Sequence, residues 1–128
     1  MSYYLARSLP IGFDEAVSRV TAALKQEGFG VLTDIDVQAT LKSKLGVDTP
    51  KYRILGACNP GFAHEALQLE NKLGVLLPCN VIVRAEKDTQ TEIAAIDPVS
   101  SMERVGNPKL AAIAEEVRGR LQRAIDSL

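Results

Sequence analysis

The chain has 128 residues, of which 46% are hydrophobic, 24% charged and 5% aromatic, and its formal net charge is −1. This length suits a single domain over residues 1–128, and the near-neutral charge gives no reason to expect nucleic acid or an anionic membrane as a partner. No apolar stretch approaches the ~18 residues of a membrane helix, and the N-terminus lacks a signal-peptide pattern. We therefore expect a cytoplasmic protein without a membrane partner.

The N-terminal third alternates between strand and helix patterns. Residues 3–9 predict a short strand. Apolar residues recur at helical spacing over 13–24, which predicts an amphipathic helix that ends at Gly28. Residues 30–37 then alternate with a period of two, which is typical of a half-exposed strand in an antiparallel sheet.

The middle of the chain repeats this order. Residues 38–45 predict a short helix with Leu41 and Leu45 on one side, and 51–57 predict a third strand. A helix over 60–73 follows, in which Asn59 is the expected N-cap and Pro60 the first helical residue. We expect this helix to end at Gly74.

The C-terminal part contains the clearest patterns. Residues 79–86 and 90–96 alternate around the polar sequence KDTQ, which predicts an antiparallel hairpin. After Asp97-Pro98 and one or two helical turns, Asn107-Pro108 begins a last helix. Its apolar stripe runs from Leu110 to Leu128.

These elements favour an α+β fold: a mostly antiparallel sheet with helices packed on one face. The alternative is a parallel sheet built from βαβ units. Its strands would read as continuous apolar runs, and the half-polar strands of this chain do not.

The chain has only two cysteines, Cys58 and Cys79, and an asparagine follows each. Cys58 lies just ahead of a predicted helix N-terminus, where free N–H groups stabilise a thiolate and bind anions. The simpler interpretation, which we favour, is that Cys58 is a small apolar residue at a strand end. Cys79 begins a strand with Val81 and Val83 on the same side, which favours burial.

Asn80 either closes a turn or presents its amide to a ligand. The chain has no C-x-x-C and no histidine pair, so we expect no metal site and no cofactor. His64 is the single histidine and lies on the outer side of its helix. A Cys58–His64 nucleophile–base pair is the arrangement to test first if the protein is an enzyme.

Four blocks, EGFGVLTDIDVQATLKSKLG, YRILGACNPGFAHEAL, GVLLPCNVIV and AIDPVSSM, resemble domain-of-unknown-function family 302 over nearly the whole chain. The resemblance implies a small α+β domain of the TATA-binding-protein-like fold group and a homodimer, without a settled activity. The family's motif positions fall on Cys58-Asn59-Pro60, Pro78-Cys79-Asn80 and Asp97-Pro98, without assigned roles.

Three functions are compatible with the sequence. The first is a binding module that takes a small, anionic or thiol-reactive molecule near the Cys-Asn motifs, with Cys58, Asn59, Cys79, Asn80 and Asp97 as candidate ligand-binding residues. The second is a cysteine-dependent enzyme or redox protein that uses Cys58, with Cys79 as resolving thiol. The third is a protein-interaction domain without a pocket.

Overall fold

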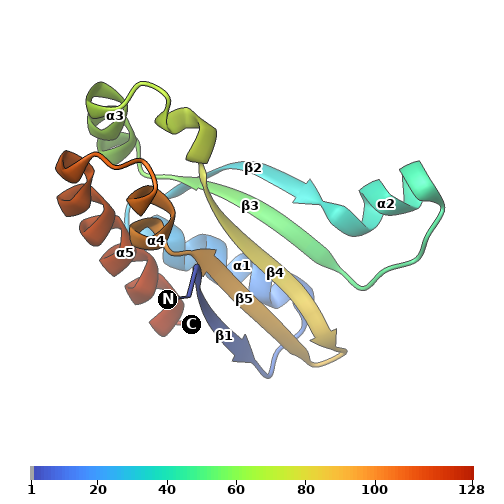
Figure 1. The fold of residues 1–128 in the computed structure, drawn as a ribbon. Helices are drawn as coiled ribbons and strands as arrows, with labels where there is room; N and C mark the ends of the chain where they lie inside the picture. Colours follow the sequence, from blue (N-terminus) through green and yellow to red (C-terminus); the bar gives the residue numbers. More distant parts are fainter. Residues whose placement is uncertain (1) are drawn as a thin grey trace.

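The computed structural model describes residues 2–128 and contains a five-stranded sheet in which every neighbouring pair of strands is antiparallel (Figure 1). The strand order is β1-β5-β4-β3-β2. This confirms the α+β prediction and the hairpin, and it rules out the parallel alternative. The strands are β1 (Tyr4–Leu9), β2 (Gly30–Asp36), β3 (Tyr52–Cys58), β4 (Cys79–Lys87) and β5 (Gln90–Ile96).

Helices flank the sheet in two groups. In the view of Figure 1, α1 lies behind the sheet and α5 lies beside it at the left, whereas α3, α4 and the short 3₁₀ turn η1 gather at the end where β3 finishes and β4 begins. None of the helices in residues 2–128 has both the length and the apolar character needed to cross a bilayer. The helices are α1 (Phe13–Gln26), α2 (Val37–Leu45), α3 (Pro60–Leu69), α4 (Pro98–Glu103) and α5 (Ala111–Asp126), with 3₁₀ turns η1 (Leu73–Leu76) and η2 (Pro108–Leu110).

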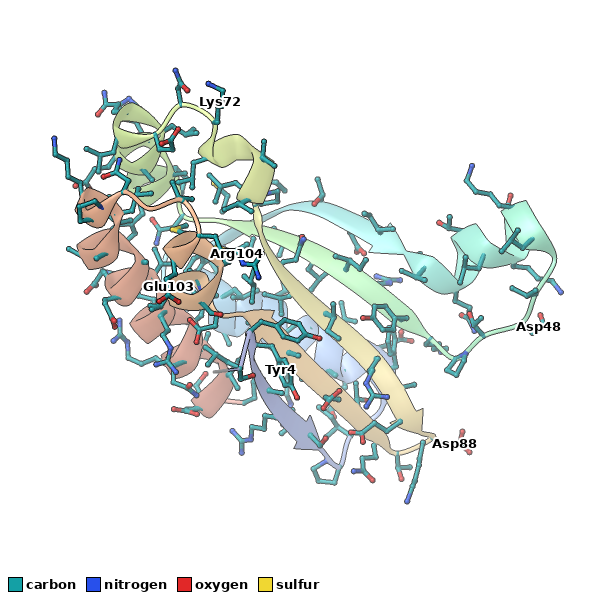
Figure 2. The ribbon with its side chains drawn as sticks, viewed as in Figure 1. Tyr4, Asp48, Lys72, Asp88, Glu103 and Arg104 are labelled. Carbon is teal, nitrogen blue, oxygen red and sulfur yellow. The ribbon has the colours of Figure 1, made fainter. Side chains whose placement is uncertain are left out.

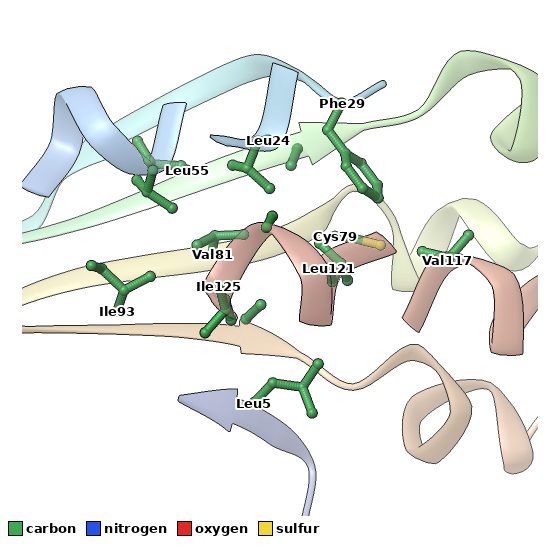
Figure 3. Close-up of a cluster of buried hydrophobic side chains, with 14 of the residues drawn as sticks. Leu5, Leu24, Phe29, Leu55, Cys79, Val81, Ile93, Val117, Leu121 and Ile125 are labelled. Carbon is green, nitrogen blue, oxygen red and sulfur yellow. The ribbon is translucent and has the colours of Figure 1, made fainter. Parts of the chain in front are cut away.

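The core lies between the sheet and helices α1 and α5 (Figure 3). Leu55, Val81 and Ile93 project from the sheet and are almost fully buried, as are Leu24 of α1 and Leu121 of α5. Burial of each such side chain contributes about 1.5–3 kcal/mol relative to exposure. The inward set predicted for the strand after Pro78 and the buried stripe predicted for the last helix are both confirmed.

The opposite face of the sheet carries an apolar row that crosses all five strands. Adjacent members of the row are register partners, so their side chains share one face: Ala6, Ala94, Ile82, Ile54 and Ile35. These side chains are half-buried or exposed. We call this surface the open face; it is turned toward the viewer in Figures 1 and 2.

The third helix is shorter than predicted. It ends at Leu69 rather than at Gly74, and Leu73 is buried in the separate turn η1. The end is set from elsewhere in the chain, because the Asn107 amide donates a hydrogen bond of 3.1 Å to the Leu69 carbonyl oxygen. A free carbonyl at a helix end needs such a partner, and sequence periodicity does not reveal it.

The second helix projects beyond the sheet (Figure 1). It is where it was predicted, and Gly46 ends it in the left-handed conformation with φ of 68°. The Asp36 carboxylate caps it by accepting a hydrogen bond of 2.9 Å from the Ala39 N–H. No residue of α2 is buried, and Leu45 is 69% exposed.

Candidate functional site

The fold brings the two Cys-Asn motifs side by side. In the β3–β4 ladder, Ala57 lies opposite Cys79, and Gly56 lies opposite Asn80. Because side chains alternate along a strand, the second motif is divided between the two faces. Cys79 points toward the helices, whereas Asn80 is exposed on the open face.

On the helix side, Cys58, Asn59 and Cys79 line a cavity of about 40 Å³. Cys58 is half-buried and Cys79 is 7% exposed. Burial, with a smaller effect of the nearby Cys58 thiolate, raises the pKa of Cys79 to about 11. The rest of the lining is apolar: Phe29, Ala57, Phe62, Ala63, Ala66, Leu77, Pro78, Met102, Ile113 and Val117.

Asn59 occupies the predicted N-cap position of α3, with Pro60 first in the helix, but its side chain does not cap the helix. Its amide instead donates to the Glu27 carbonyl oxygen at 3.4 Å, at the end of α1. The Arg120 guanidinium donates to the same oxygen at 3.3 Å and lies 5.3 Å from the ring centroid of Phe62. Asn59 therefore joins the start of α3 to the end of α1.

Among the residues that the structure describes, no candidate general base lines the cavity that the two cysteines share. No carboxylate, imidazole or amine lines their cavity. His64 is exposed on α3 and contacts Gln68 at 3.4 Å. Within residues 2–128, no group of three or more His, Cys, Asp or Glu side chains could hold a metal ion.

A larger hollow lies on the open face. It measures about 500 Å³ and is lined by Tyr3, Tyr4, Tyr52, Asn80, Ile82, Arg84, Glu92, Ala94, Ala95 and Ile96. Figure 2 shows Tyr4 on this face, in front of the sheet. Of these residues, the sequence had singled out Asn80 alone. The sequence did contain one indication of this hollow. Several outward-facing residues of the hairpin are apolar, whereas the outward face of a solvated strand is polar.

The polar groups of this hollow neutralise one another. Arg84 Nε donates to Glu92 Oε1 at 2.6 Å, and this hydrogen bond raises the pKa of Arg84. Tyr3 and Tyr4 pack edge to face with ring centroids 5.0 Å apart. The hollow thus offers aromatic and aliphatic surface, the Asn80 amide and phenol groups to a ligand without strong net charge.

Asp97 lines neither of these hollows. Its buried carboxylate accepts hydrogen bonds from Val99 N (3.0 Å) and Ser100 N (3.4 Å) at the start of α4, and from Arg118 Nε at 3.0 Å. These contacts give Asp97 a structural role. Asp97 fixes α4, which carries Met102 to the cysteine cavity.

Comparison with known proteins identifies one family. The sequence profile described as Domain of unknown function DUF302 matches residues 5–128. A similar solved structure is that of an uncharacterized conserved DUF302 protein from Bacillus stearothermophilus, with a TM-score of 0.90, 31% sequence identity and 98% of each chain covered. No curated protein matches the chain.

Proposed function

The chain belongs to the DUF302 family, and we propose that it is a small-molecule-binding module whose ligand lies in the hollow of the open face. The observation that carries the proposal is this hollow of about 500 Å³. Pockets for small molecules typically measure about 300–1,000 Å³ and are mostly apolar with a few polar groups. The cysteine cavity, at about 40 Å³, is too small for such a ligand.

The lining favours a particular class of ligand. Ile82, Ala94 and Ile96 form an apolar floor, and tyrosines flank it. Arg84 is already paired with Glu92, so an anion would gain less from it than from an unpaired arginine. We therefore propose a neutral, partly apolar molecule with a polar group that hydrogen-bonds to the Asn80 amide, rather than the anionic ligand considered from the sequence.

The hollow can be filled to test this function. Ala94→Arg places a large side chain on the floor of the hollow, and Ala22→Arg on the exposed surface of α1 is the matched control. Native mass spectrometry of protein purified from its own host should show a retained small molecule in the wild type and the control but not in Ala94→Arg. The neutral apolar dye Nile red gives a second readout. Dye binding that is equal in all three proteins, with no retained molecule, would refute the proposal.

The assembly that we propose is a homodimer formed through residues 32–47, which we call the β2–α2 arm. Leu32, Ile35, Leu45 and Val47 in this arm are 69%, 48%, 69% and 42% exposed. The nine-residue helix α2 has no buried residue, and isolated helices shorter than ~12–15 residues are marginal in water. A partner surface would supply the missing packing.

The charges of this surface are compatible with a second copy of the chain as the partner. Lys42 pairs with Asp48 at 2.9 Å, and Asp34 pairs with Arg53 at 3.1 Å. Because these charges are balanced within one chain, two identical arms can meet around a two-fold axis without strong repulsion. The same apolar side chains would then cover one another.

A thiol-dependent reaction at Cys58 has less support. Cys58 and Cys79 do line one cavity, but no base lines it with them. Both cysteines are free, which suits the reducing cytoplasm that we propose as the location.

A further inference from the structure

Three sulfur-bearing side chains line the cysteine cavity, on the side of the sheet away from the open-face hollow. Cys58 comes from the end of β3, Cys79 from the start of β4 and Met102 from α4. We propose that this cavity binds a soft monovalent metal ion, Cu(I), through the two thiolates and the thioether sulfur of Met102.

The chemical types of the three sulfur ligands determine which metal ion the cavity would prefer. Thiolate and thioether sulfurs are soft ligands that favour Cu(I). Zinc sites are almost always four-coordinate and combine thiolate with imidazole or carboxylate ligands or with further thiolates. The lining contains two cysteines and includes no His, Asp or Glu.

The size and access of the cavity fit one ion. Its volume of about 40 Å³ exceeds the ~10–15 Å³ that a single water needs. Cys79 and Met102 are each 7% exposed, whereas Cys58 is half-buried. Cys58 is therefore the most solvent-accessible of the three sulfur-bearing residues.

The charges of the complex can be accommodated. Each cysteine exchanges its S–H bond for an S–Cu bond, so two protons leave for each Cu(I) bound and no oxidation state changes. The bound unit carries a charge of −1, the sum of two thiolates and one Cu⁺. Helix α3 begins at Pro60, two residues after Cys58, and its N-terminal end carries partial positive charge. The Arg120 guanidinium also lies beside Phe62, which lines the cavity, but its charge is paired with Glu116 at 3.1 Å, so the helix end supplies the main compensation.

A competition titration tests the site. Reduced, metal-free protein is titrated with Cu(I) under anaerobic conditions against the chromophoric chelator bathocuproine disulfonate. The wild type and Tyr52→Phe, a control in the open-face hollow, should retain one copper per chain. Cys58→Ser should lower the affinity by at least about 100-fold and Met102→Leu by about 10-fold, given that even changes outside the ligand shell cost 10–100-fold.

Met102→Leu keeps the proposal testable if the cysteine variants are unstable, because this exchange nearly conserves side-chain volume and should leave the fold intact. Far-ultraviolet circular dichroism checks the fold of each variant. Excess Zn(II) should not displace the copper. Complete loss of copper to the chelator, wild-type affinity in Cys58→Ser or Met102→Leu, or one copper shared by two chains would each overturn the assignment.

Discussion

The thiol of Cys79 lies among apolar side chains, and its pKa of about 11 compares with an ordinary value of 9.0. The unfolded chain therefore loses this proton at lower pH than the folded protein does. Between these two pKa values the unfolded state binds fewer protons, so the free energy of unfolding falls as pH rises. This part of the free energy of unfolding is fully present below about pH 8, and about 2–3 kcal/mol of it is lost by about pH 11.

Urea unfolding of reduced, metal-free protein between about pH 8 and pH 10.5 measures this effect. The free energy of unfolding of the wild type should decline more steeply with pH than that of Cys79→Ala, whatever the stability of the variant at neutral pH. Equal slopes in the two proteins would show that Cys79 ionises as readily in the folded state as in the unfolded chain.

The sequence predicted the positions of some single residues but not all of their contacts. Alternation along the strand correctly placed Cys79 with Val81 and Val83 in the core. The position of Asn59 was predicted, but its hydrogen bond to Glu27 was not, since that partner lies 32 residues away. The approach of Met102 to the cysteines depends on the docking of α4, which no local pattern encodes.

Within the sheet, β3 fits between its neighbours only because position 56 is a glycine. A Cβ atom at Gly56 would lie 2.1 Å from Thr33 Oγ1 of β2 and 2.7 Å from Pro78 Cγ, the residue before β4. Both distances are far below van der Waals contact. Gly56→Ala should therefore destabilise the protein by about 1–3 kcal/mol, the usual cost of overpacking.

Gly30→Ala is the matched control, because Gly30 also lies in the sheet and its added Cβ would meet nothing within 4 Å. Chemical denaturation should show a change of less than about 0.5 kcal/mol for this variant, as for most surface substitutions. If Gly56→Ala were as stable as Gly30→Ala, the tight contact among β2, β3 and the turn before β4 would be wrong.

Whole strands and helices were predicted more reliably than their ends. The two periods, 2 for strands and 3.6 for helices, are local properties that sequence displays directly. The end of α3 depends instead on Asn107, 38 residues further on. The start of α5 shows the same influence of context, because Asn107 caps the 3₁₀ turn η2, from which the helix continues at Ala111.

Across the whole molecule, the sequence predicted that helices cover one face of a sheet but not what the other face contains. The apolar row of the open face joins residues from Ala6 to Ala94 that only the strand order brings together. The sequence therefore indicated the cavity of the two cysteines as the candidate site, because the tyrosines and aliphatic residues that line the larger hollow form no local motif.

In the proposed dimer, the stability of helix α2 in the β2–α2 arm depends on assembly. In a single chain α2 has a cap at each end but no buried residue, so its backbone hydrogen bonds should open readily. In a dimer formed through the arm, Leu45 would be covered and the helix would gain packing. Protection of the α2 amides against hydrogen exchange should then depend on dimer formation, whereas α5, which is packed against the core, should be protected in either state.

Leu45→Asp should break this dimer, because it places a charge where apolar side chains meet. Val75→Asp is the matched control, since Val75 is 86% exposed but lies in η1, outside the arm. At tens of micromolar, sedimentation should give dimers for the wild type and Val75→Asp and a monomer for Leu45→Asp. Hydrogen exchange in the α2 amides should be faster in Leu45→Asp by at least about 10-fold, the factor that corresponds to 1.4 kcal/mol of lost protection. A monomeric wild type, or a dimer that survives Leu45→Asp with α2 still protected, would mean that the arm is not the interface and that α2 is stable within one chain.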